Sequence, residues 1–191
     1  MKDCGEAFHG KHLSHAISYI TDAGKTQGGK LVDGVNCIPA LAFEQMKDTK
    51  RKYGKPDKRQ GYHLIISFKE NEVTPDTAME LTSRFVKEYL GSEYEAVYAV
   101  HDNTRHIHAH IVFNSVSFLT GKKYRYEKAD WAREIQPITN RLCQEYGLST
   151  IEIEDDKLNQ DVEYRETRKE QAIQHVWNSA IRRDLDACII L

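Results

Sequence analysis

The chain has 191 residues, with hydrophobic residues at 40% and charged residues at 29%, which is typical of a soluble globular protein. No apolar run approaches the roughly 18 residues that cross a bilayer, and the polar N-terminus lacks a secretory signal, so neither membrane insertion nor export is expected. The formal net charge of −2 leaves no overall basic footprint of the kind that nucleic acids attract. Four widely separated cysteines indicate reduced thiols in a cytoplasmic protein.

The first half of the chain predicts two helices, a strand and a third helix. Apolar residues at helical spacing favour helices at residues 12–23 and 38–52. A short run of branched residues at 63–68 predicts a strand. Thr74 offers an N-cap hydroxyl in front of a proline, so it is expected to begin the third helix, which Gly91 ends.

The second half predicts a hairpin, a helix and one further strand. Residues 94–101 and 106–116 have the composition of strands, and the short polar connection between them favours an antiparallel pair. Residues 129–146 have helical spacing, although Pro137 is expected to kink the helix or to restart it. Residues 150–153 are predicted to form a last strand.

These elements predict one α+β domain at residues 1–153, with an antiparallel sheet of about five strands and helices mainly on one face. The acidic, polar stretch that follows is typical of a linker, so residues 154–191 are predicted to hold this linker and a C-terminal helical segment. No internal repeat or low-complexity segment divides the sequence further.

Three histidines alternate along the strand predicted at residues 106–116. Because side chains alternate between the faces of a strand, His106, His108 and His110 share one face, and the residues between them form an apolar face for the core. The preceding strand ends in a fourth histidine, His101. Neutral imidazoles two residues apart can bind one ion from the same side, and a neighbouring strand can add a third. We therefore predict a metal site on the exposed side of the sheet, although any single histidine could be ordinary polar surface.

The order of several motifs is similar to that of a known family. His101, His108-Ala-His110 and Asn114-Ser-Val closely resemble the metal motif of the HUH endonucleases, and best that of the relaxase and mobilisation nuclease branch. Tyr19-Ile-Thr-Asp-Ala-Gly-Lys25-Thr26 resembles the first motif of that family. The resemblance covers residues 13–148, and further matching segments follow in the expected order at 34–37, 62–68, 73–75 and 114–118.

The resemblance implies an HUH-like fold and a role for each motif residue. Tyr19 would be the nucleophile, His101, His108 and His110 would bind the metal ion, and His106 would orient substrate or support a ligand. The family implies Mg²⁺ or Mn²⁺, whereas imidazole ligands alone favour Zn²⁺ or another later metal.

The activity implied by the resemblance is site- and strand-specific nicking and strand transfer at a transfer origin, through a covalent 5′-phosphotyrosine, in the mobilisation of plasmids or integrative elements. The implied partner is single-stranded DNA in a bacterial cytoplasm, together with accessory proteins and a type IV coupling machinery.

The sequence departs from the family at two places. Many relatives carry an acid two residues after the first histidine, where this chain has Asn103, with Asp102 beside it. A carboxylate often orients a ligating imidazole, so which residue does so here is left open. Residues 1–11 also do not resemble the short strand that usually precedes the tyrosine helix.

Two basic clusters are candidates for DNA contact. Residues 47–59 hold seven basic side chains and two acids, and residues 122–128 combine four basic residues with two tyrosines. Basic groups bind phosphates and tyrosines can stack on unpaired bases, although each cluster could also be solvated surface. The predicted DNA contacts are Lys25, Thr26, Lys50, Arg51, Lys55, Lys58, Tyr124 and Tyr126.

Two alternative functions fit part of this pattern. A replication initiator or transposase of the same superfamily would share the chemistry, but in those branches the tyrosine usually follows the histidines. A non-catalytic DNA-binding or metal-sensing module could use the same histidines, but it would have no need of Tyr19.

Overall fold

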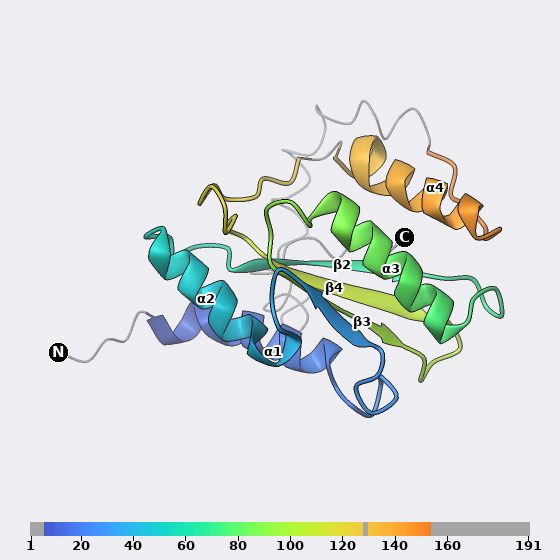
Figure 1. The fold of residues 1–191 in the computed structure, drawn as a ribbon, viewed down its shortest axis with the longest axis horizontal. Helices are drawn as coiled ribbons and strands as arrows, with labels where there is room; N and C mark the ends of the chain where they lie inside the picture. The colour runs from blue at the N-terminus through green and yellow to red at the C-terminus, as the bar shows by residue number, and fades with distance from the viewer. Residues whose placement is uncertain (1–5, 128–129, 154–191) are drawn as a thin grey trace, which may run out of the picture.

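Four strands form one antiparallel sheet in the computed structural model, which describes residues 6–127 and 130–153. The spatial order is β1-β3-β4-β2, with the bounds β1 (Val32–Val35), β2 (Gly61–Ser67), β3 (Ala96–His101) and β4 (His108–Asn114). β3 and β4 form the predicted antiparallel hairpin at the centre of the sheet (Figure 1). The predicted C-terminal helical segment at residues 154–191 lies outside the described residues.

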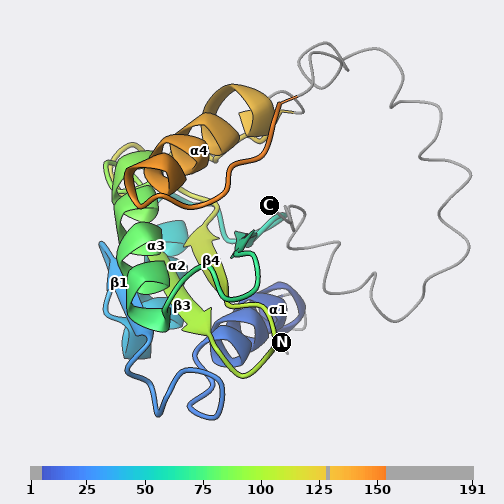
Figure 2. The ribbon, with the colours of Figure 1, turned by 90° about the vertical axis from the view of Figure 1, so that its right-hand side faces the viewer.

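Helices cover both faces of this sheet (Figures 1 and 2). α3 (Pro75–Tyr89) and α4 (Gln136–Glu145) pack on one face, and α1 (Glu6–Ile20) and α2 (Ala42–Lys52) pack on the other. The prediction of helices mainly on one face is therefore wrong. Histidines and Asn114 on one face of β4 gave that face the pattern of an exposed surface, although α1 and α2 cover it.

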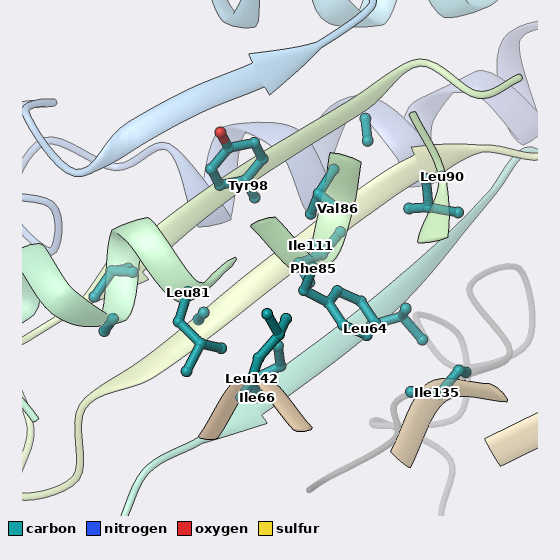
Figure 3. Packing of buried hydrophobic residues seen from close by; sticks show 14 of the residues in the cluster. Leu64, Ile66, Leu81, Phe85, Val86, Leu90, Tyr98, Ile111, Ile135 and Leu142 are labelled. Atoms are coloured by element: carbon teal, nitrogen blue, oxygen red, sulfur yellow. The ribbon is translucent and has the colours of Figure 1, made fainter. Parts of the chain in front are cut away.

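The larger core lies between the sheet and the pair α3 and α4 (Figure 3). Leu81 and Phe85 of α3 and Leu142 of α4 are fully buried against strand residues that include Leu64 and Ile111. Ile111 belongs to the apolar face predicted from the alternation along β4, so that part of the prediction is confirmed.

A smaller apolar cluster fixes α1 and α2 to the opposite face. α1 contributes one apolar stripe, which ends at the fully buried Ile20, and α2 contributes Ala42 and Met46. The stripe and these two residues meet Val97, Ala99 and Val112 of the central strands. This packing brings the C-terminal end of α1 over the ends of β3 and β4 that carry histidines.

Two strand predictions differ from the structure, so the sheet has four strands rather than about five. β1 was not predicted because Asp33 and Gly34 occupy the middle of its four residues, and both residue types are rare in strands. Residues 150–153 form no strand. The side chain of Asn140 accepts from the N–H of Ile151 at 3.1 Å and donates to its carbonyl at 2.7 Å, so this backbone is satisfied without a neighbouring strand.

Local signals set several helix ends as predicted. The hydroxyl of Thr74 accepts from the N–H of Thr77 at 3.2 Å and begins α3. A π-helical turn at Trp131–Ile135 precedes α4, and Pro137 lies in the first turn of α4, which confirms the predicted restart. The helix expected from residue 38 begins as a 3₁₀ turn, Pro39–Leu41, and continues as α2. None of the described helices is long and apolar enough to cross a membrane.

Candidate active site

Three histidines of the central hairpin converge at one end of the sheet. His101 ends β3 and lies directly opposite His108, the first residue of β4, and His110 follows on the same face. One ring nitrogen of each lies within 4.8 Å of the others, and the ring centroids of His101 and His110 are 4.5 Å apart. The register of the two strands thus brings the predicted set of ligands together.

Hydrogen bonds decide which nitrogen of each ring is free for a metal ion. Nε2 of His101 lies 2.9 Å from the carbonyl oxygen of Ile20, and Nδ1 of His108 lies 3.0 Å from that of His106. A carbonyl only accepts, so these two nitrogens carry the protons, and the other nitrogen of each ring keeps its lone pair. Nδ1 of His110 lies 2.8 Å from Nε2 of His63.

Burial affects two rings of the cluster and leaves one atom of His110 without a partner. Burial, and then the neighbouring imidazoles, lower the pKa of His110 to about 2, and burial also lowers the pKa of His101. Nε2 of His110 is buried and has no hydrogen-bond partner within the described part of the chain. Three imidazoles with their ring nitrogens this close fit a divalent ion once the rings close by roughly an ångström, to share bonds of about 2.1 Å.

α1 carries Tyr19 to the edge of this cluster. Its ring is edge-on to the rings of His101 and His110, with 5.8 Å between centroids in both cases. The Tyr19 side chain is 52% exposed, whereas the neighbouring Ile20 is fully buried. The apolar stripe therefore anchors the helix while the phenol stays open to a substrate beside the histidines.

The loop after α1 places a cation on the ring of Tyr19. Nζ of Lys25 lies 3.6 Å from the ring centroid, within range of a cation–π interaction. Thr26 is fully buried, and its hydroxyl donates to the carbonyl of Asp22 at 2.8 Å. Thr26 thus shapes the loop from inside, and Lys25 is the member of this predicted pair that faces the site.

His106, Asp102 and Asn103 do not take the positions around the cluster that the sequence predicted. His106 lies outside β4, so the prediction of a strand from residue 106 is wrong at its start. The side chain of His106 is exposed, and its carbonyl holds His108. Asp102 accepts from Nε2 of Gln27 at 2.5 Å, and Asn103 is exposed. Among the described residues, backbone carbonyls contact His101 and His108, and His63 contacts His110, so neither Asp102 nor Asn103 orients these rings.

His63 is the residue of the site that the sequence did not reveal. It lies on β2 opposite Val112, so its side chain emerges on the histidine face, diagonal to His110. Burial, and then the nearby His101, lower the pKa of His63 to about 4, which keeps it neutral at pH 7. A lone histidine in an apolar strand gave no signal, and only the strand register shows its position.

The first basic cluster is divided between the interior and the surface. Lys50 is only 2% exposed, its Nζ donates to the carbonyl of Met46 at 3.3 Å, and burial lowers its pKa to about 7. Nζ of Lys55 donates to the carbonyl of Gly121 at 2.5 Å. Of the four predicted phosphate contacts in this cluster, only Arg51 and Lys58 have exposed side chains.

The fold joins the two basic clusters into one surface. Nζ of Lys123 donates to the carbonyl of Asp57 at 2.6 Å, and Lys55 makes the reciprocal contact with the second loop. We call this the basic surface, formed by Lys52, Lys55, Lys58, Lys122 and Lys123. It lies where β2 begins and β4 ends, because Gly61 pairs with Asn114. At about 3.3 Å per residue, this end of β4 is roughly 20 Å from His108.

Tyr124 and Tyr126, predicted to stack on bases, both pack on the larger core. The ring of Tyr124 is 5.0 Å from that of Phe113, and its hydroxyl forms a hydrogen bond with that of Tyr89. Burial raises the pKa of Tyr124 and raises that of Tyr126 to about 12. Only part of each ring is therefore available to a base.

Comparison with known proteins agrees with this geometry. The nuclease domain profile of the relaxase family, MobA/VirD2-like, matches residues 19–148. Two Staphylococcus aureus proteins named rlx are 31% and 36% identical over 176 and 143 residues, which cover 92% and 74% of this chain and 50% and 43% of the relatives. The group II intron-interrupted relaxase LtrB of Lactococcus lactis subsp. cremoris is 27% identical over 179 residues, covering 74% of this chain and 32% of LtrB.

This chain spans about half the length of the curated relatives that it matches, or less. No solved structure gives a significant match to it. The matched region begins at Tyr19 and includes all three converging histidines. The chain therefore belongs to the MobA/VirD2-like relaxase family, and the part that matches is the nuclease domain of that DNA-nicking family.

Proposed function

We propose that this chain nicks one DNA strand at a transfer origin and keeps the cleaved end as a covalent tyrosine adduct. The observation that carries the proposal is the position of Tyr19, a half-exposed phenol edge-on to two of three converging histidines. Membership of the relaxase family supports DNA cleavage, and the position of the phenol supports Tyr19 as the attacking group.

In the proposed reaction, the phenolic oxygen of Tyr19 attacks a phosphorus atom of the DNA backbone. The Oη–P bond forms and the P–O3′ bond breaks, so the 5′ phosphate stays on Tyr19 and a 3′ hydroxyl leaves. The phenol loses its proton to solvent, and the departing oxygen takes one up. Because the adduct is a phosphodiester, a 3′ hydroxyl can later attack it and rejoin a strand.

His101, His108 and His110 would hold a divalent ion beside the scissile phosphate. Such an ion, when bound, neutralises charge on the phosphate as a Lewis acid. Three imidazoles favour Zn²⁺ or another later metal, whereas phosphate and water oxygens suit Mg²⁺ or Mn²⁺, so both classes belong in the test. By family, the proposal includes accessory proteins and a type IV coupling machinery as partners.

Denaturing electrophoresis of labelled single-stranded oligonucleotides that carry transfer origins tests the proposal. The parent protein with Mn²⁺ is expected to give a slowly migrating protein–DNA band. Tyr19→Phe removes one oxygen with little change in volume, so it is expected to fold and bind Mn²⁺ but to give no adduct. A His108→Ala, His110→Ala variant is expected to lose both Mn²⁺ binding by calorimetry and cleavage. An adduct that persists in Tyr19→Phe would contradict the assignment of the nucleophile.

A further inference from the structure

We propose that His63 is a positioning residue that sets the tautomer of His110 and thereby allows His110 to bind a metal ion. This inference rests on the proposed metal centre but concerns a residue outside the ligand set. Nε2 of His63 lies 2.8 Å from Nδ1 of His110, and the ring centroids are 4.9 Å apart. His63 comes from β2, whereas all three ligands come from β3 and β4.

The three ligands differ in what holds their outer nitrogen. His101 and His108 each face a backbone carbonyl, which only accepts, so the backbone itself fixes the tautomer of both rings. His110 faces a second imidazole, which can donate or accept. A single proton lies between Nδ1 of His110 and Nε2 of His63, so the tautomer of one ring decides that of the other.

Only one of the two arrangements is compatible with metal binding. If His63 donates, His110 must carry its own proton on Nε2, the buried atom that faces the cluster, and it has no lone pair there. If His110 donates from Nδ1, its Nε2 keeps a lone pair and His63 holds its proton on Nδ1. Nε2 of His110 is buried and has no hydrogen-bond partner among the described residues, so an ion at this position would satisfy it.

The sheet fixes the geometry of this pair. His63 pairs with Val112 and Ile65 pairs with His110, which makes the two histidines diagonal neighbours on one face. His110 is buried and His63 is partly buried, so water competes weakly for their hydrogen bond. β2 therefore supplies the support for a centre whose ligands all belong to the neighbouring hairpin.

Two substitutions separate this role from simple packing. His63→Phe keeps a ring of similar size but removes the acceptor, and it is expected to weaken Mn²⁺ binding by about 10- to 100-fold in calorimetry. His63→Gln places an amide oxygen near the position of Nε2 and is expected to restore most of the affinity. His15→Gln changes an exposed histidine on α1, and as the matched control it is expected to bind Mn²⁺ like the parent.

Nitrogen-15 NMR of the histidine rings in the metal-free protein gives a readout that packing alone would not move. The parent is expected to carry the His110 proton on Nδ1. In His63→Phe that proton is expected to shift towards Nε2, because a buried Nδ1–H would lack an acceptor while Nε2–H would face the lone pairs of His101 and His108.

The outcomes distinguish this inference from the proposed function. Equal Mn²⁺ affinity in the parent and His63→Phe, or an unchanged His110 tautomer, would overturn the role of His63 and leave the metal centre standing. Absence of Mn²⁺ binding in the parent would instead overturn the proposed centre. If thermal unfolding shows that His63→Phe does not fold, His63→Asn takes its place. It is also expected to weaken Mn²⁺ binding and to shift the His110 proton, since its shorter side chain does not reach His110.

Discussion

An imidazole binds a metal ion only in its neutral form, and in this protein burial favours the neutral form of His110 and His63. The pKa of His110 lies at about 2 and that of His63 at about 4, both well below the ordinary value of 6.5. At neutral pH His110 is already neutral, so an ion bound there would not compete with protons for this ring. The exposed phenol of Tyr19 stands at the open side of this desolvated group, where a DNA backbone can approach.

Lys25 is expected to contribute to catalysis through the ring of Tyr19. Its Nζ lies 3.6 Å from the ring centroid. A positive charge at this position stabilises the negative charge that develops on the phenol oxygen and on the attacked phosphate. Lys25→Met is expected to slow single-turnover adduct formation by roughly tenfold, which corresponds to about 1.4 kcal/mol. Because Lys25 also repels positive charge on His101 and His110, the variant is expected to bind Mn²⁺ at least as tightly as the parent.

Lys25→Arg is the matched control, since it keeps the positive charge near the ring. It is expected to retain most of the parent rate. Equal rates for the parent and Lys25→Met would show that the cation does not assist the attack.

The helix α2 carries a cation into the interior. Ala42, Met46 and Lys50 form its buried side, and the amine of Lys50 is close enough for the carboxylate of Glu95 to affect its pKa. Glu95 also accepts hydrogen bonds from Thr49 at 2.9 Å and from Asn114 at 2.6 Å. Burial outweighs the attraction to Glu95, so the pKa of Lys50 falls to about 7.

Lys50→Met is therefore expected to stabilise the protein at pH 7. The pKa of Lys50 is lower in the folded protein than in the unfolded chain, where it is about 10.5. The free-energy cost of burying Lys50 is therefore largest below pH 7, and it disappears as the pH rises towards 10.5. We expect the variant to gain about 1 to 4 kcal/mol in the free energy of unfolding at pH 7, and much less at pH 10. Urea denaturation at both pH values measures the difference.

Lys52→Met changes an exposed lysine at the end of the same helix and provides the control. Its free energy of unfolding is expected to follow that of the parent at both pH values. A gain for Lys50→Met that is the same at pH 7 and pH 10 would show that the proton of Lys50 is not responsible.

Strong local patterns made most elements predictable from the sequence. The alternation along β4 identified the apolar face and placed His108 and His110 together on the other face, where the structure groups them with His101, and the cap at Thr74 located α3. β1 has no such pattern, because it exists through pairing with β3. His63 could not be identified for a related reason: it contacts His110 only because β2 takes its register beside β4.

At the scale of the whole molecule, the two faces of the sheet carry different kinds of side chain. α3 and α4 cover the face that holds the larger apolar core, and α1 and α2 cover the face that carries the histidines and the buried polar groups (Figure 1). Along β4, the histidines lie at one end and the basic surface lies at the other, about 20 Å away. Local sequence could not show this, since the two basic clusters meet only through the fold.

The basic surface is expected to bind the backbone of single-stranded DNA that extends from the site. Lys52, Lys58 and Lys122 are its exposed members, whereas Lys55 and Lys123 already donate to carbonyls. Each lysine that neutralises a phosphate on a single strand contributes about 0.7 to the slope of log affinity against log salt concentration. Changing all three exposed lysines to glutamine is therefore expected to flatten the slope by about 2, measured by fluorescence anisotropy at several salt concentrations.

A second triple variant shows whether position or charge alone is responsible. Lys87, Arg133 and Arg141 are exposed on α3, on the π-helical turn and on α4, so their change to glutamine removes the same charge from another part of the molecule. This control is expected to leave the slope within a few tenths of the parent value, because only groups that displace counterions from phosphates affect it. Equal flattening in both variants would mean that net charge determines binding and that the basic surface is not the path of the strand.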